Sequence, residues 1–442
     1  MSVQFLAAWN GYEDDQVVHN LSGAEEIRLI GLGLCRAYVA GQDGRSLAAV
    51  MQDPVTGGQF AGQAAVSGYG TAITNGAALK PFAQVLAGAT SAEVYITATG
   101  DSLIQLGGDT ANQSSDTLAE RDGFLAQLRA QLNARLGTPD GGQWVAVEAA
   151  PSDTRVANNA TVPINQFGPY NAYRNSSSTI VQRRAMALQA TGQSITFTVV
   201  GRYLDIEIWE NAGTYVGTAT WTVDGGGGGT INSNGGGGAT DTYRTVRLDL
   251  VTDAAHVVAI TWATGSVMLT GATVTRGRGV VTRRFGYGGS KASVWTALTA
   301  KQLRTSFQTL TTHLHIIRFS YNDWNNQVAD GLTLAAYKGY LQTLIDAALA
   351  NTSVKAVLLV NDPEASTADN KPILYRAFSD AMRELATGRV AFYDVDASTN
   401  SAYSAGNTAG YYVDFVHRSG AGYAAEARAL TEVLTSSSLL VA

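Results

Sequence analysis

EVYITATGDSL, residues 93–103, is the most informative stretch of the chain. Its first part, Glu93 to Ala98, is an apolar run typical of a buried strand, and it ends in a small-residue turn that carries Ser102. A serine at a strand end can project its hydroxyl beyond the sheet edge as a nucleophile. Gly-Asp-Ser is also common in ordinary turns, so the stretch needs partners elsewhere in the chain.

Two later tetrapeptides are candidates for those partners. The first is DFVH, residues 414–417, just before the last predicted helix. An Asp three residues before a His lets one turn supply a general base and the carboxylate that orients it. The second, SYND at 320–323, follows a strand-like run at 314–319. Open α/β sheets place their sites at the carboxyl ends of the strands, so we expect these pieces to meet there.

The order of these motifs resembles the SGNH (GDSL) hydrolases, an α/β family that cleaves esters, many of them on sugars. GDSL at 100–103 matches the nucleophile block, and GYGGS at 286–290 is similar to the glycine block. SYND at 320–323 matches the asparagine block, and DFVH at 414–417 matches the closing Asp-x-x-His. One departure is Ser320, which stands where the family usually has glycine but is small enough to fit.

The resemblance implies a role for one or more residues of each block. Ser102 would be the nucleophile, His417 the general base and Asp414 the group that orients it. The backbone amides of Ser102 and Gly289 and the side chain of Asn322 would form the oxyanion hole. Another glycine of the same block could serve in place of Gly289. The resemblance implies no metal and no organic cofactor.

Two other polar groups rival these assignments. Asn361-Asp362 also ends a buried strand, but it comes later than the block order allows, so Asn322 is preferred. Asp394 and Asp396 end a neighbouring strand without a His at short range. Capping or loop hydrogen bonding is the preferred interpretation of those two carboxylates.

The other histidines are predicted to be structural. His19 and His256 have no partner at useful spacing. His313 and His315 lie two apart on a strand and share a face, but no carboxylate or cysteine stands near them. The sequence therefore predicts no metal site.

Composition narrows the class of protein. The chain has 442 residues, enough for two to four domains, and a net charge of −6 without a basic block, which argues against nucleic acid. No stretch approaches the ~20 apolar residues of a membrane span. The lone Cys35 excludes an internal disulfide, and the first residues lack the basic region of a secretory signal. The chain is therefore expected to be cytosolic or to leave the cell by another route.

The pattern predicts a three-layer α/β/α hydrolase with a parallel sheet, divided by an insertion. Residues 91–150 would form its first part and residues 281–442 its second. Between them, apolar residues alternate with polar ones along several short runs of residues 151–280. This alternation predicts strands of an inserted, jelly-roll-like β-sandwich that is similar to carbohydrate-binding domains. The glycine runs at 225–229 and 235–238 are not expected to form packed elements.

Some residues are candidates for substrate contact. Trp209 and Trp221 of the insertion could stack on sugar rings, although alternating aromatic residues in a sandwich more often form the core. Tyr287 in the glycine block and Asp101 beside Ser102 complete this set.

The N-terminal part is expected to stand apart. Residues 1–45 resemble the short adaptor at the start of many phage head- and tail-fibre proteins, with a helix at about 23–32; an ordinary βα unit packed on the hydrolase is the alternative. Residues 46–90, rich in Gly and Ala, are predicted to be a linker.

These patterns predict a serine esterase that removes O-acetyl groups from a bacterial surface polysaccharide as part of a phage virion fibre. Its partners would be the host glycan and, through the N-terminus, other virion proteins. A homo-oligomer is expected, with a trimer as the default for fibres. The alternatives are a fibre or decoration protein that acts mainly as a glycan-binding receptor module, and a free secreted (extracellular) acyl esterase.

Overall fold

The structure, a computed structural model, describes residues 2–5, 17–19, 35–38, 72–105, 122–145, 156–158, 160, 186–210, 216–233, 242–286, 288–296, 310–363, 371–399 and 403–436. The chain divides into two compact units, Met1–Thr71 and Ala72–Ala442. In the first unit, β1 (Ser2–Phe5) pairs antiparallel with both β2 (Val17–His19) and β3 (Cys35–Tyr38). The helix predicted at 23–32 lies outside the described residues.

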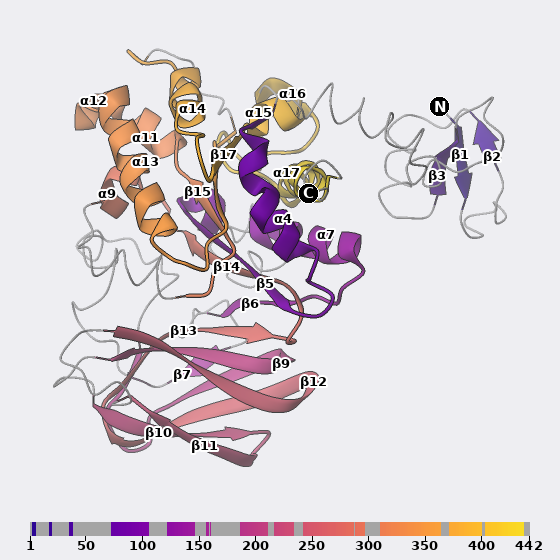
Figure 1. The fold of residues 1–442 in the computed structure, drawn as a ribbon. Helices are drawn as coiled ribbons and strands as arrows, with labels where there is room; N and C mark the ends of the chain where they lie inside the picture. The colour runs from indigo at the N-terminus through magenta and orange to yellow at the C-terminus, as the bar shows by residue number, and fades with distance from the viewer. Residues whose placement is uncertain are drawn as a thin grey trace. The chain divides into compact units, whose positions relative to one another are not determined.

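A parallel sheet forms the centre of the second unit (Figure 1). In it, β5 (Glu93–Gly100) lies between β14 (Gly279–Gly286) and β15 (Leu314–Arg318). The sheet continues through β16 (Ala356–Val360) to β17 (Val390–Tyr393). These strands are buried over almost their whole length, as expected where helices cover both faces of a parallel sheet. The predicted α/β class is confirmed.

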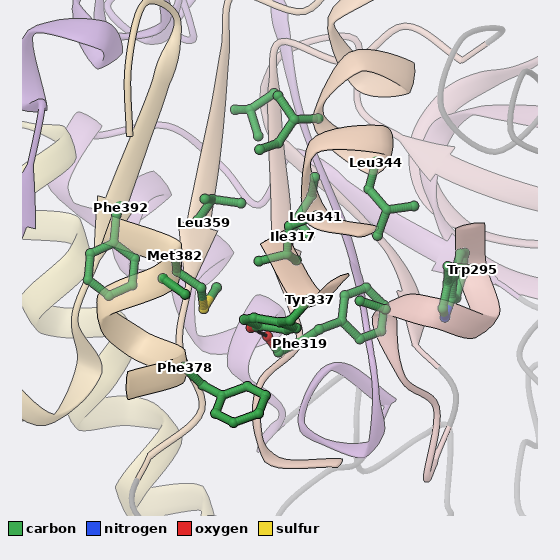
Figure 2. Packing of buried hydrophobic residues seen from close by; sticks show 14 of the residues in the cluster. Trp295, Ile317, Phe319, Tyr337, Leu341, Leu344, Leu359, Phe378, Met382 and Phe392 are labelled. Atoms are coloured by element: carbon green, nitrogen blue, oxygen red, sulfur yellow. Dashed lines mark hydrogen bonds between the residues drawn. The ribbon is translucent and has the colours of Figure 1, made fainter. Parts of the chain in front are cut away.

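Helices cover the two faces of this sheet (Figure 1). On one face, α9 (Ala292–Thr296), α13 (Leu334–Leu349) and α14 (Tyr375–Glu384) share a hydrophobic cluster with β15, β16 and β17. Figure 2 shows this packing around Tyr337, Leu359 and Phe378. On the other face lie α7 (Phe124–Leu136) and α17 (Gly420–Leu434), which contact each other.

The helix ends follow from the sequence. Thr333 accepts a hydrogen bond from the amide of Ala336 and begins α13, and Ser419 does the same for α17 through the amide of Gly422. Gly137, in the left-handed region at φ 67°, ends α7. Short helices complete this part: α5 (Ser102–Gln105), α11 (Tyr321–Asn325), α12 (Gln327–Asp330), α15 (Val395–Thr399) and α16 (Tyr403–Thr408).

The predicted linker at 46–90 is wrong for its last part. Residues from Ala72 onward belong to the second unit, where β4 (Ile73–Thr74) pairs antiparallel with β17. The 3₁₀ helix η1 (Gly76–Leu79) and the helix α4 (Lys80–Leu86) follow, and α4 buries Phe82. Because Gly and Ala dominate the composition of this stretch, composition predicts a linker and does not detect the one short apolar helix face.

Antiparallel strands make up the segment that lies in the chain between β6 and β14, and they form one end of the sheet (Figure 1). The long β12 (Thr242–Gly265) pairs with β9 (Ser194–Glu210) on one side and with β10 (Gly217–Val223) on the other. β9 also pairs with β13 (Val267–Thr275). Two short strands, β7 (Val156–Asn158) and β8 (Met186–Leu188), pair with β9 and β13.

This segment is not separate from the hydrolase part. β6 (Gly142–Val145) pairs antiparallel with β13 and parallel with β14, so the hydrogen bonds of the two regions run through it without a break. Contacts likewise place both regions in one compact unit. The boundary predicted at residue 150 therefore does not separate two independent domains, and the jelly-roll assignment stays a prediction.

One glycine run is also different from expectation. β11 (Gly226–Asn232) contains most of the run at 225–229 and pairs with β10 as the edge strand of the sheet. Its glycines are exposed, and backbone pairing rather than side-chain packing holds them there. The second run, at 235–238, lies outside the described residues.

Candidate active site

The register of the parallel strands gathers three of the sequence blocks at one sheet edge. Gly100 at the end of β5 lies opposite Gly286 at the end of β14 and opposite Arg318 at the end of β15. The residues that follow each strand therefore leave the sheet side by side. These are the nucleophile block, the glycine block and the asparagine block.

Ser102, His417 and Asp414 form a continuous chain of hydrogen bonds. The Oγ of Ser102 lies 3.0 Å from Nε2 of His417, although 315 positions separate the two residues. The other ring nitrogen, Nδ1, lies 2.7 Å from Oδ2 of Asp414. A hydroxyl, an imidazole and a carboxylate in this order can remove the hydroxyl proton and activate the oxygen as a nucleophile. The structure thus brings together the three residues that the sequence proposed.

Asp414 also builds the turn that carries His417. Its Oδ1 accepts hydrogen bonds from the amides of Val416 (2.8 Å) and His417 (2.7 Å). Partial burial raises the pKa of Asp414, but the bonds from the His417 ring and from these two amides outweigh it and hold the pKa below its usual range. The carboxylate is therefore ionised at neutral pH and fixes both the turn and the ring.

Asn322 contacts the nucleophile block through Asp101. Its Nδ2 donates to Oδ2 of Asp101 at 2.8 Å, and the amide of Leu103 donates to the other oxygen at 2.9 Å. Asp101 is only 1% exposed, and burial, with the nearby charge of Asp362, raises its pKa well above the usual value. Because both oxygens are engaged inside the protein, the predicted substrate contact by Asp101 is wrong. The carboxyl instead connects the Ser102 turn to Asn322.

The glycine block is fixed to its neighbours by its last residue, Ser290, and by Ala292 just beyond it. Ser290 is buried, and its Oγ donates to the carbonyl of Gly100 at 3.2 Å. The amide of Ala292 donates to Oδ2 of Asp323 at 3.0 Å. Gly289 itself is exposed and has φ +74°, a conformation that favours glycine. Tyr287 lies outside the described residues.

A buried network of charges, which the sequence analysis missed, lies beneath the site. Arg318 bonds Asp362 through Nε and Glu426 through Nη1, each at 3.1 Å. Glu426 also accepts from Nε of Arg418, the residue after His417, at 2.7 Å. All four side chains are fully buried. Two positive and two negative charges balance, and they join the asparagine block to the His417 turn.

The rival polar groups Asn361, Asp362 and Asp394 have partners inside the protein. Asn361 and Asp362 are both 0% exposed, and the Asn361 amide bonds Ser379 and Asp394 inside the protein. Asp394 pairs with Arg383 at 2.8 Å and accepts from the amide of Ala397. This agrees with the preference for Asn322 and with the capping role expected of Asp394.

His313 and His315 have partners within the fold. Nδ1 of His313 accepts from the amide of Tyr95, and burial lowers the pKa of His315 to about 3 beside the hydroxyl of Thr99. Among the described residues, no group of three or more side chains could hold a metal ion.

His256 corrects the sequence interpretation, because it does have a partner. Its Nδ1 lies 2.8 Å from Oδ2 of Asp224, 32 positions earlier. Asp224 sits in the tight turn between β10 and β11 at φ 50°, and its other oxygen accepts from the amide of Val257. Strand pairing rather than sequence spacing brings the two side chains together.

The aromatic candidates of the inserted segment lie on its strands. Trp221 is partly buried and packs against the hydrophobic cluster of β9, β12 and β13, which agrees with the core role that the sequence allowed. Trp209 belongs to β9 and pairs with Met268 of β13 and Tyr243 of β12.

No helix in the described part of the chain is long and apolar enough to cross a membrane.

Solved structures give the comparison for this arrangement. The chain is similar to a structure described as a peptidoglycan O-acetylesterase, with a TM-score of 0.54 and 16% identity, covering 80% of this chain and 94% of the other. It shares that fold. A family two carbohydrate esterase from Cellvibrio japonicus matches 66% of this chain and 96% of its own at 15% identity, but its TM-score of 0.24 is too low to support an argument. No family model and no curated protein matches the chain.

Proposed function

We propose that this chain is a serine esterase of the SGNH type. The observation that carries the proposal is the unbroken chain from Asp414 through His417 to Ser102, with N···O separations of 2.7 and 3.0 Å. The four sequence blocks in the family's order support the same assignment, and so does the shared fold with a peptidoglycan O-acetylesterase.

In the proposed reaction, Nε2 of His417 takes the proton of Ser102 as Oγ forms a bond to the ester carbonyl carbon. The tetrahedral intermediate collapses, the carbon–oxygen bond to the alcohol breaks, and His417 returns the proton to the leaving oxygen. Water, deprotonated by the same imidazole, then bonds to the acyl carbon. The bond from that carbon to Oγ of Ser102 breaks, His417 returns the proton to Oγ, and the acid leaves. Asp414 keeps the proton of the neutral ring on Nδ1 and stabilises the imidazolium.

The oxyanion hole is proposed to combine three donors: the amides of Ser102 and Gly289 and the side chain of Asn322. A primary amide has two N–H hydrogens, and Asp101 takes only one of those on Asn322. The second can point to the developing negative charge, where a fixed donor is worth about 10²–10³-fold in kcat.

The proposed substrate is an O-acetyl group on a bacterial surface polysaccharide. Ser102 is buried and His417 is partly exposed, which suits a small acyl group, and the structural neighbour is described as a peptidoglycan O-acetylesterase. Trp209 and Tyr287 remain proposed sugar contacts.

Acetate release tests this proposal. Purified protein should release acetate from O-acetylated bacterial polysaccharide or peptidoglycan and none from the same polymer after alkaline de-O-acetylation. Ser102→Ala should release none, while Ser353→Ala, at the opposite end of β15, should match wild type. Hydrolysis of p-nitrophenyl acetate without release from any O-acetylated glycan would reject the substrate. If Ser102→Ala kept both the hydrolysis of p-nitrophenyl acetate and the release of acetate from glycan, the mechanism would be rejected.

The proposed setting is a phage virion fibre, with a homo-oligomer held through the N-terminal unit. The support is the adaptor-like sequence of residues 1–45 and the separate compactness of Met1–Thr71. Antibodies against residues 72–442 should label intact virions of a phage that encodes this chain. Absence of the chain from purified virions would favour the free esterase.

A further inference from the structure

Ser320 is the one position of the four blocks where this chain departs from the family pattern, and the structure gives its hydroxyl a defined environment. Ser320 is 0% exposed and lies directly before α11, which carries Asn322. Its Oγ donates to Oδ2 of Asp362 at 3.0 Å and accepts from the amide of Asp362 at 2.8 Å. The hydroxyl of Tyr375 lies 2.9 Å away. A glycine would make none of these side-chain contacts.

Asp362 holds the whole turn rather than the hydroxyl alone. Its Oδ2 also accepts from the amides of Ser320 (2.9 Å) and Tyr321 (2.8 Å), while Oδ1 accepts from Arg318. Arg318 ends β15, so its ion pair fixes Asp362 relative to the sheet. The carboxylate therefore connects the end of a rigid strand to the first residues of α11.

The consequence falls on Asn322, one residue beyond this turn. One N–H of its Nδ2 donates to Asp101, so a single N–H remains to donate to the oxyanion. A shift of the turn would point this N–H away from the oxyanion. Displacements of about 1 Å at a reacting centre can cost about 10²-fold in rate. The contacts of Ser320 are thus placed where they can act on the rate without touching substrate.

We propose that Ser320, through Asp362, is a positioning residue for Asn322 in the oxyanion hole. This inference rests on the proposed esterase function. The Ser320 hydroxyl would then affect the rate through the position of Asn322. Asp362 would contribute in the same indirect way, although its side chain is buried.

A double-mutant cycle tests it, using p-nitrophenyl acetate and wild type, Ser320→Ala, Asn322→Ala and the double variant. Ser320→Ala should lower kcat about tenfold with little change in KM, because it removes one of three bonds from the turn to Oδ2. In the Asn322→Ala background, the same change should lower kcat less than twofold, since the residue it positions is gone. A tenfold loss in both backgrounds, or no loss in either, would overturn the proposal.

Two controls keep the outcome specific. Ser353 has matching contacts, accepting from the amide of Thr312 at 2.9 Å and donating to its carbonyl at 3.1 Å, but at the opposite end of β15. Ser353→Ala should therefore leave kcat unchanged even where it lowers the melting temperature. Ser102→Ala distinguishes failure of the esterase mechanism from failure of the positioning role. If Ser102→Ala keeps activity, the esterase mechanism is wrong. If Ser102→Ala is inactive but Asn322→Ala is fully active, only the positioning role is wrong.

Discussion

Replacing Asp414 by Asn separates the two tasks of this carboxylate. The asparagine Oδ1 can still accept from the amides of Val416 and His417, so the turn is expected to form. The oxygen that faced Nδ1 of His417 at 2.7 Å becomes an NH₂ group, which can only donate. The imidazole must then accept at Nδ1 and carry its proton on Nε2, facing Ser102. In that tautomer it cannot take the hydroxyl proton.

The expected loss in kcat is about 10²–10⁴-fold. The upper figure is the loss for the same change in a protease triad, where the wrong tautomer is also trapped. Stability should remain near that of wild type, because both amide bonds of the turn persist. A loss of this size is expected to be smaller than that of Ser102→Ala, which removes the nucleophile.

The assay is kcat for p-nitrophenyl acetate at neutral pH, together with the melting temperature. Asp224→Asn is the matched control, because Asp224 also bonds a histidine ring and a backbone amide, each at 2.8 Å, but within the β10–β12 region. It should leave kcat unchanged. A kcat of Asp414→Asn within tenfold of wild type, in folded protein, would show that Asp414 does not set the tautomer of His417.

Three further predictions concern the rest of the second unit. Burial raises the pKa of Asp323 from 3.8 to about 7. The unfolded chain therefore loses this proton at lower pH than the folded chain, and the free energy of unfolding falls as pH rises between those values. Asp323→Asn should have a higher melting temperature than wild type at pH 8 but not at pH 4. Glu426→Gln should lower the free energy of unfolding by about 3–5 kcal/mol, measured in urea, because it leaves Arg318 and Arg418 buried with one partner charge fewer; a loss below 1 kcal/mol would contradict this. A chain starting at Ala72 should fold and keep its esterase activity, whereas one starting at Ser91 should lose stability with β4 and α4; equal melting temperatures would show that these elements add nothing.

The sequence predicted the parts of the site that are local. Gly100-Asp101-Ser102 and Asp414 to His417 each combine a strand end or turn with reactive side chains within four residues. The parallel strands were visible because burial on both faces makes each an uninterrupted apolar run. Their carboxyl ends must then meet, which placed Ser102 near Asn322 in the prediction. The order of the four motifs, rather than a strand end, added His417.

What the sequence missed depends on partners far apart in the chain. Arg318 and Glu426 are separated by 108 positions, and nothing in their local context marks either as buried. The His256–Asp224 pair depends on how two strands align. Residues 72–90 were taken for a linker because their small residues outweigh a single buried helix face in composition.

Labelling with a fluorophosphonate tests whether Ser102 is a nucleophile that His417 activates. The reagent forms a phosphorus–oxygen bond with an activated serine as fluoride leaves, and intact-protein mass spectrometry with peptide mapping locates the adduct. We expect one adduct, on Ser102, that forms at least a hundredfold more slowly in His417→Ala and is absent from Ser102→Ala. Absence of labelling in the folded wild type, or an adduct on another residue, would contradict it.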